Sequence, residues 1–105
     1  MASFSTQEHM YFWIFVGSRG GKMRLNIIQR LLERLANVNQ LAKELNVNYR
    51  TVLHHLEILE KNGLIRSEGP KYGALYFVSD IVETNSDWFN SLLGKRSEAP
   101  GGTSR

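Results

Sequence analysis

The sequence contains no cysteine and no long hydrophobic run. Without cysteine there is no disulfide framework, no thiolate metal site and no cysteine nucleophile. The longest apolar run, residues 10–16, has seven residues, whereas a membrane-spanning helix needs about 20. The chain also lacks the basic start and the small-residue cleavage site of a signal peptide. We therefore expect a soluble, cytoplasmic protein with no membrane partner.

Signatures of catalysis are missing as well. No carboxylates are paired in a shared setting, and no nucleophile is spaced to a base. The segment GSRGGK, residues 17–22, resembles a phosphate-binding loop, but Met23 stands where such a loop needs Ser or Thr, and the glycine spacing is wrong. We therefore expect a protein that is not an enzyme and that needs no cofactor.

Positive charge is concentrated in the middle of the chain. The net charge is +3, but residues 17–72 hold ten Lys and Arg against five Glu, while the flanks hold three basic and five acidic residues. A surface that faces nucleic-acid phosphates carries such an excess. The 105 residues suffice for one small domain, so we place a nucleic-acid surface in its central region.

Two amphipathic helices with a three-residue break are predicted within residues 39–65, NQLAKELNVNYRTVLHHLEILEKNGLI. The first covers residues 40–45 and the second residues 49–62, with caps that we assign to Asn39 and Asn48. Gly63 suits the left-handed residue that ends a helix. Two helices joined by so short a turn form a helix-turn-helix. Apolar residues recur at helical spacing on one face of each: Leu41, Ala42 and Leu45, then Val52, Leu56 and Leu59.

The start of the second helix is the candidate DNA-reading surface. In a helix-turn-helix the second helix lies in the major groove, and its N-terminal residues meet the base edges. Arg50 suits base reading, because arginine pairs bidentately with guanine O6 and N7; a phosphate contact or a solvated helix start is the alternative. Asn48 caps the helix first, and Tyr49 and Thr51 can donate to phosphates.

A β-hairpin is predicted directly after Gly63. Residues 64–67 and 74–78 favour strands, and the Gly-Pro pair between them favours a turn. The hairpin therefore has the place of a wing, residues 66–76. Arg66, Lys71 and Tyr72 of this wing can reach the minor groove or its phosphates, or they are solvated residues of a turn.

An amphipathic helix over residues 22–36 is predicted before the helix-turn-helix. We place Arg24, Arg30 and Arg34 on its solvated side with Glu33. Arg19 and Lys22, at the start of this helix, are candidates for contacts with a DNA phosphate. The apolar side is formed by Leu25, Ile28, Leu31, Leu32 and Leu35.

Both flanks are rich in aromatic residues. Residues 8–16, EHMYFWIFV, fit a buried strand or a buried helix, and periodicity does not decide between them. We favour a short helix. Residues 79–94 predict a C-terminal helix with a break at 84–86. This much aromatic surface exceeds the need of one small core, which indicates a dimer interface in addition to core packing: Tyr11, Phe12, Trp13, Phe15, Trp88, Phe89 and Leu92.

The predicted fold is α+β and mostly α, a winged helix-turn-helix with a three-helix core and a β-hairpin wing. The DNA-binding domain covers residues 17–78. The N-terminal aromatic segment 1–16 and the C-terminal helix 79–94 flank it as dimerisation elements. The tail, residues 95–105, is rich in Gly, Pro and Ser, and we expect it to be disordered.

Residues 51–65, TVLHHLEILEKNGLI, resemble the V-x-x-H-L-x-x-L-x-x-x-G-L-[VI] signature of ArsR-like winged-helix transcriptional regulators. RLNIIQRLLER and NVNQLAKELNVN resemble the preceding helices, and GSRGGKMRL is similar to the start of small archaeal members. The resemblance implies a homodimer on pseudo-palindromic double-stranded DNA. It places Leu53 and His54 at groove-facing positions beside Asn48, Tyr49 and Arg50. It gives His55 a partly buried packing role.

The metal-binding motifs of the family's sensors are missing. They carry a Cys-x-Cys motif near the recognition helix, or carboxylate and histidine pairs on a terminal helix, and neither occurs here. His54 and His55 are adjacent on a helix and point about 100° apart. We therefore expect no metal site, and the sequence identifies no small-molecule effector.

The resulting hypothesis is a dimeric transcriptional regulator that binds specific double-stranded DNA, with helix 48–62 in the major groove and the wing near the minor groove. Fold alone does not determine function. A winged helix that binds protein or RNA, or an architectural binder of DNA without sequence preference, is the alternative.

Truncation after Gly94 is predicted to leave folding and DNA binding unchanged, because a disordered tail contributes nothing to the core. Thermal unfolding of the truncated and full-length chains tests this. A large drop in melting temperature would show that the tail is ordered.

Overall fold

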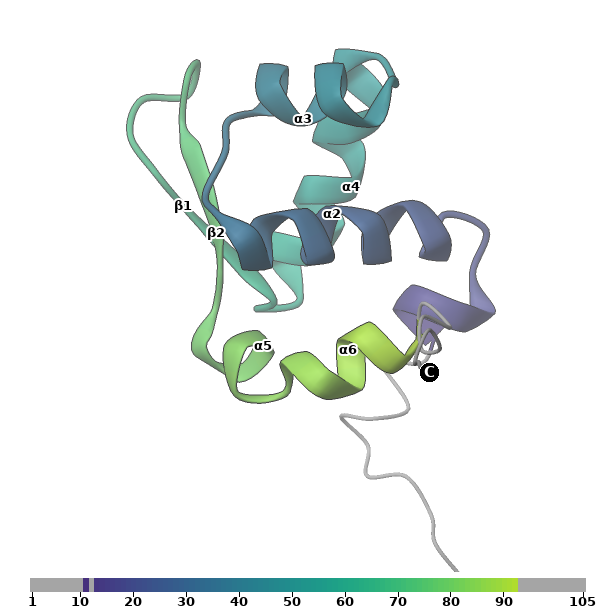
Figure 1. The fold of residues 1–105 in the computed structure, drawn as a ribbon. Helices are drawn as coiled ribbons and strands as arrows, with labels where there is room; N and C mark the ends of the chain where they lie inside the picture. Colours follow the sequence, from purple (N-terminus) through teal and green to yellow (C-terminus); the bar gives the residue numbers. More distant parts are fainter. Residues whose placement is uncertain (1–10, 12, 93–105) are drawn as a thin grey trace, which may run out of the picture.

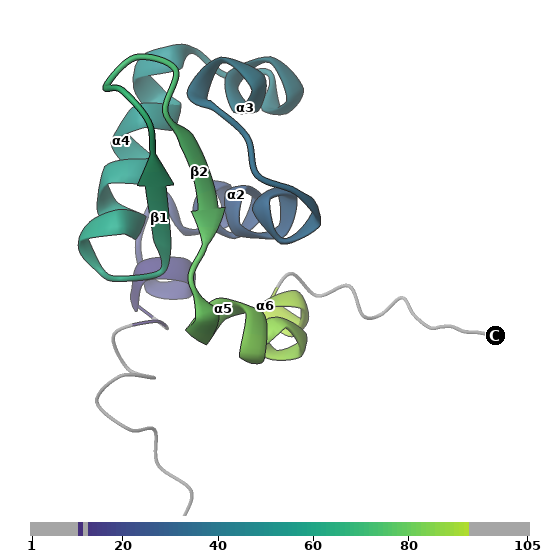
Figure 2. The same ribbon diagram turned by 90° about the vertical axis from the view of Figure 1, so that its left-hand side faces the viewer.

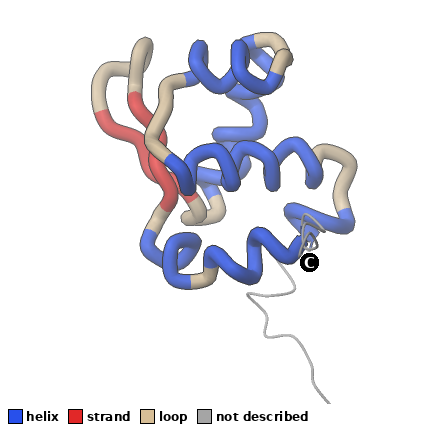
Figure 3. Tube along the Cα trace, viewed as in Figure 1, coloured by secondary structure: helices blue, strands red, loops and turns tan. Residues whose placement is uncertain are grey.

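The computed structural model describes residue 11 and residues 13–92. Phe12 and the predicted tail, residues 95–105, lie outside the described residues. Helices and a single hairpin make up the described part, as Figure 3 shows by colour. In chain order the elements are the π-helical turn η1 (Trp13–Gly17), α2 (Gly21–Glu33), α3 (Val38–Leu45), α4 (Tyr49–Lys61), β1 (Ile65–Glu68), β2 (Leu75–Val78), α5 (Asp80–Thr84) and α6 (Ser86–Leu92).

Helix α2 runs through the centre of the molecule. Figure 1 shows α3 on one side of it and α6 on the other, with the hairpin at the C-terminal end of α2. Helix α2 contacts η1, α4, β2 and α6. Its Ile27 and Ile28 are fully buried, so α2 forms the middle of the hydrophobic core. The predicted class, a winged helix-turn-helix that is mostly α, is confirmed.

Helix α2 ends three residues earlier than predicted. The prediction extended it to Ala36, but the chain becomes extended at Arg34. The Ala36 amide donates to the Tyr76 carbonyl at 3.1 Å, and the Tyr76 amide donates back at 2.8 Å. This short bridge to β2 takes residues 34–36 out of the helix. Leu35, predicted on the apolar side, is therefore 48% exposed.

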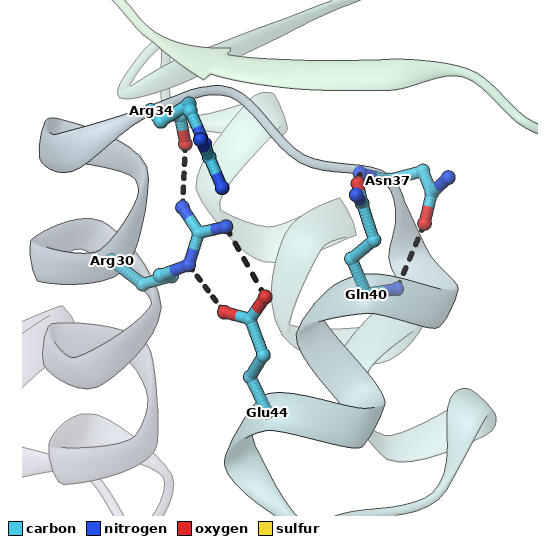
Figure 4. Close-up of polar contacts among 5 residues, drawn as sticks. All are labelled: Arg30, Arg34, Asn37, Gln40 and Glu44. Atoms are coloured by element: carbon cyan, nitrogen blue, oxygen red, sulfur yellow. Dashed lines mark hydrogen bonds and ion pairs between the residues drawn. The ribbon is translucent and has the colours of Figure 1, made fainter.

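Helix α3 is capped by Asn37 and not by Asn39 as predicted. The Asn37 side chain accepts from the Gln40 amide at 2.8 Å, and the Gln40 side chain accepts from the Asn37 amide at 2.8 Å. Figure 4 shows this reciprocal pair. Such a capping box satisfies two N–H groups that the first turn leaves without helical partners. Asn39 is an exposed residue inside the helix.

The predicted ends of α4 are confirmed to within a residue. The Asn48 side chain accepts from the Thr51 amide at 2.8 Å and caps the helix. Gly63 follows the helix with φ of +75°, in the left-handed region that glycine adopts without strain. Asn46 in the turn before α4 also has a positive φ, of 59°. Asparagine tolerates this conformation better than most residues, and the chain can therefore reverse within three residues.

The hairpin is antiparallel, and Ile65 pairs with Val78 at its base. Its strands begin one residue later than predicted, at Ile65 and Leu75. The C-terminal helix is interrupted at Asn85, as predicted, which gives α5 and α6. The Ser79 hydroxyl donates to the Leu64 carbonyl at 3.1 Å instead of capping α5, so it ties the end of β2 to the start of the hairpin.

Arg30 connects α2 to α3, although it was predicted to be solvated. Its guanidinium forms a two-pronged ion pair with Glu44 of α3 and donates to the Arg34 carbonyl at 2.7 Å (Figure 4). The bond to Arg30 lowers the pKa of the Glu44 carboxyl. The Arg30 side chain thus holds α3 against α2 and donates to a backbone carbonyl just after the end of α2.

Replacing Asn37 by Ala is predicted to lower the free energy of unfolding by about 1 kcal/mol, because it removes the cap of α3. Urea unfolding measures the change. Asn39→Ala is the matched control, and we expect it to change stability by less than about 0.5 kcal/mol, since Asn39 is exposed inside the helix. Equal losses in the two variants would contradict the assignment of the cap.

Candidate nucleic-acid interface

Helix α4 is divided into a buried face and an exposed face. Val52, Leu56 and Leu59 are fully buried against the core. On the other side of the helix, the predicted DNA-binding residues have an exposed or half-buried surface: Asn48, Tyr49, Arg50, Thr51, Leu53 and His54. The apolar stripe read from the sequence therefore points to the core, and the polar start of the helix is available to a ligand.

A shallow groove of about 440 Å³ lies between α4 and the wing. Figure 2 shows the hairpin lying alongside α4. Tyr72 at the hairpin turn is 78% exposed. The structure thus brings the start of α4 and the wing together. The groove is lined by Tyr49, Arg50, Leu53, Glu57, Glu60, Lys71, Tyr72 and Tyr76.

Charges of opposite sign occupy different parts of this groove. Arg50 lies in the first turn of α4, and Lys71 lies in the hairpin turn. Glu57 and Glu60 lie two or more turns further along α4. Glu60 also accepts from the Ser67 hydroxyl on β1 at 2.9 Å. An anionic ligand is therefore attracted to the start of α4 and to the turn of the wing, and it is repelled from the second half of the helix.

Six of the eleven predicted DNA-binding residues do not line the α4–wing groove. Asn48, Thr51 and His54 lie at the start and in the first half of α4, and the other three belong to neither α4 nor the hairpin turn. Arg66 lines a hollow with Asp80 and Glu83, near the base of the hairpin. Arg19 and Lys22 line another hollow at the start of α2, together with apolar residues of η1 and α6. All three are exposed. The structure brings none of them to the groove.

The predicted interface aromatics are divided between core and surface. Tyr11, Phe15 and Phe89 are buried within the single chain, and Phe15 packs edge-on against Phe89 with ring centroids 5.3 Å apart. Trp13 is 64% exposed. Trp88 and Leu92 are half-buried. Residues 13–17 are helical, in agreement with the favoured alternative for this segment.

Arg24 is the largest departure from the sequence analysis. It was placed on the solvated side of its helix, but it is 5% exposed. Its guanidinium donates to the Ile14 carbonyl at 3.1 Å, to the Ser18 hydroxyl at 2.5 Å and to His55 Nδ1 at 3.0 Å. Helix α2 is covered by η1 and α4 at this point, so a polar residue there needs partners from both.

His55 lies on α4 and accepts the hydrogen bond from Arg24. A guanidinium can only donate, so Nδ1 must be the unprotonated nitrogen of the ring. Burial lowers the pKa of His55, and the neighbouring charges of Arg24 and His54 lower it further. His55 is therefore neutral at pH 7. The packing role that the resemblance implied for His55 includes this bond, and no local sequence pattern indicated its partner.

The described residues show no sign of a metal centre or a membrane span. Over residue 11 and residues 13–92, no group of three or more His, Asp or Glu side chains lies close enough together to hold a metal ion. None of the helices in the same part of the chain is long and apolar enough to cross a bilayer.

Residues 21–67 match the sequence model of a family described as "Bacterial regulatory protein, arsR family". The matched region begins with α2 and ends in β1, so it contains the whole helix-turn-helix. No curated protein has a sequence that matches the chain significantly.

Solved structures share the fold at low sequence identity. The homodimeric winged helix-turn-helix DNA-binding domain of a Mycobacterium bovis protein has a TM-score of 0.66 at 18% identity, over 93% of this chain and 94% of that one. A transcriptional regulator homologue from Pyrococcus horikoshii has a TM-score of 0.63 at 21% identity, over 90% and 96%.

ZitR of Lactococcus lactis, a C30AH42A mutant, has a TM-score of 0.63 at 17% identity, over 70% of this chain. This chain spans only 53% of the ZitR chain. Sequence identities this low show a shared fold alone. The shared fold agrees with the match of residues 21–67 to the arsR family model. The chain is thus an ArsR-like winged helix-turn-helix protein, related over residues 21–67 to the bacterial regulatory proteins of the arsR family.

Proposed function

We propose that this protein is a dimeric, sequence-specific regulator of transcription that binds double-stranded DNA in the cytoplasm. The observation that carries the proposal is the groove between α4 and the wing, with Arg50 and Lys71 on its two walls. In this proposal α4 enters the major groove, and the wing lies over the adjacent minor groove.

The charges of α4 limit how DNA can lie on it. Glu57 and Glu60 would face phosphates if the DNA backbone followed the second half of the helix. We therefore propose that base contacts are confined to the first turns of α4, from Asn48 to His54. Arg50 is the base-reading residue, Leu53 is placed for an apolar contact such as a thymine methyl, and Tyr49 and Thr51 donate to phosphates.

Lys71 and Tyr72 form the DNA contact of the wing in this proposal, because both line the groove from the hairpin turn. Arg19, Lys22 and Arg66 lie in other hollows. We propose phosphate contacts for these three residues only, on DNA that extends beyond the α4–wing groove.

Dimerisation is proposed through η1 and α6. Trp13 is exposed, and Trp88 and Leu92 are half-buried beside the aromatic core. Tyr11, Phe15 and Phe89 support this surface from beneath, and Phe12 completes the proposed set. A two-fold dimer would place the two recognition helices about one DNA turn apart. The Mycobacterium bovis domain, which is homodimeric, supports the proposal by analogy.

A protein-interaction module is the second candidate, because the exposed Trp13 offers an apolar surface away from α4. Salt dependence separates the two functions. Binding through six to ten phosphates weakens by about 10³–10⁵ between 50 and 200 mM salt. An aromatic protein interface changes far less over the same range.

Arg50→Ala is predicted to weaken binding to the preferred DNA sequence by about 1–3 kcal/mol, because it removes a bidentate contact with a guanine. The DNA is first obtained by selection from a random-sequence pool, and affinity is then measured for the selected and a scrambled duplex. Loss on the selected duplex alone indicates base reading.

Arg34→Ala is the charge-matched control. Arg34 is exposed and lies outside the α4–wing groove, although it shares a hollow with Arg66, so we expect an equally small loss of affinity, or none, on the selected and the scrambled duplex. Equal weakening by Arg50→Ala on both duplexes would reduce Arg50 to a phosphate contact. Failure of the wild type to bind any duplex at low salt would overturn the proposed function.

A further inference from the structure

The recognition helix is tied to the N-terminal turn by one buried guanidinium. Arg24 of α2 donates to the Ile14 carbonyl at 3.1 Å and to the Ser18 hydroxyl at 2.5 Å on one side, and to His55 Nδ1 at 3.0 Å on the other. The Ser18 hydroxyl also donates to the Ile14 carbonyl at 3.1 Å. Three segments that are distant in sequence thus meet at a single side chain.

His55 occupies a position next to the proposed DNA surface. It is 8% exposed, whereas His54, the preceding residue on α4, is exposed and lies in the groove-facing set. The two imidazole rings have centroids 5.4 Å apart. A change in the position of His55 therefore moves the part of α4 that carries His54 and lies one turn after Arg50.

The surroundings of this bond are positively charged. Among the described residues, the charges that act on His55 are those of Arg24 on α2 and His54 on α4. The turn before α2 adds the hydroxyl of Ser18 and the exposed cation Arg19, but no carboxylate. Within the described residues, Arg30 forms an ion pair with Glu44, whereas Arg24 forms no ion pair with a carboxylate.

The space around the bond is also closely filled. Gly20 lies against it, and a Cβ atom at that position would be 2.5 Å from His55 Cε1 and 2.7 Å from a guanidinium nitrogen of Arg24. Gly20 has φ of −88° and ψ of 12°, a conformation open to other residues. The absence of a side chain at residue 20 therefore serves the approach of Arg24 and His55.

We propose that Arg24 is a positioning residue for DNA binding, which holds the recognition helix through neutral His55 and releases it when His55 takes up a proton. The proposal rests on the proposed DNA-binding function. A protonated imidazole has N–H groups at both nitrogens and cannot accept from Arg24. It would also place two cations 3.0 Å apart in a buried site.

The direction of the pH effect follows from the lowered pKa of His55. The folded chain disfavours the proton, whereas the unfolded chain takes it up near the ordinary histidine pKa of about 6.5. Stability is therefore complete above about pH 6.5 and declines as pH falls below it. DNA affinity is predicted to fall at the lower pH at which folded His55 titrates, by about tenfold for each further pH unit.

The first test measures affinity for the selected duplex between pH 5.5 and 8 at constant ionic strength. The full-length chain is used with His9→Asn and His54→Asn, so that His55 is the sole histidine. With this reference the pH dependence of binding reports on His55 alone, and its affinity at pH 7.5 is compared with that of the wild type. Circular dichroism at each pH establishes that the chain stays folded.

Conservative rescue separates positioning from a general loss of stability. His55→Asn in the reference keeps an acceptor oxygen close to the place of Nδ1 but cannot take up a proton there. We expect it to bind at pH 7.5 within about threefold of the reference and to lose the fall in affinity at low pH. His55→Leu, which has no acceptor, should bind weakly at every pH. A fall with pH that persists in His55→Asn would overturn the proposal.

Substitution at Gly20 gives an independent test. Gly20→Ala pushes His55 away from Arg24 by sterics alone, so it should weaken DNA binding at pH 7.5. The chain with Gly20 intact is the comparison, and circular dichroism establishes that the variant stays folded. Unchanged affinity of Gly20→Ala would contradict the positioning role.

NMR titration of the single His55 resonance in the reference reports on the pair without DNA. Titration below the ordinary histidine pKa, with the proton on Nε2 in the neutral form, is the expected result. An ordinary pKa would overturn the positioning role even if DNA binding is intact. Failure to bind DNA at every pH would instead overturn the proposed function, and the NMR result would still decide whether Arg24 and His55 form their bond.

Discussion

Burial of α2 on several sides is the constraint on which the rest of the structure depends. The helix contacts η1, α4, β2 and α6. Its isoleucines Ile27 and Ile28 fill the centre of the core. Its arginines reach out of the core to other elements, Arg24 to η1 and α4 and Arg30 to α3. The same helix therefore supplies both the packing and the polar links of the fold.

These links give α4 a defined position in the domain. Helix α4 is held from its apolar face by Val52, Leu56 and Leu59, which sets its depth in the domain. A purely apolar contact permits sliding and rotation more readily than a directional hydrogen bond does. The bond between Arg24 and His55 adds that direction close to the middle of α4. The buried Arg24 side chain thus helps to position the exposed face of α4, which it does not itself contact.

The arrangement also connects the two regions to which different functions are assigned. Ile14 and Ser18 accept hydrogen bonds from Arg24. Ile14 belongs to η1, the turn that carries the exposed Trp13, and Ser18 directly follows this turn. An aromatic surface proposed for dimerisation and a helix proposed for DNA reading therefore share one buried polar group. A polar group in such a place is costly when its partners are lost, so movement of either region away from Arg24 would destabilise this site.

The sequence by itself determined the elements whose signals are local: α4 with its cap Asn48, the left-handed Gly63, the hairpin and the break at Asn85. Caps, turns and periodicity act within a few residues and are therefore legible without the fold. Only the tertiary structure decided that Arg24 is buried, that α2 ends at Glu33 and that Phe15 and Phe89 are in the core. Periodicity shows which residues share a face of a helix, but what covers the other face depends on elements far away in the chain.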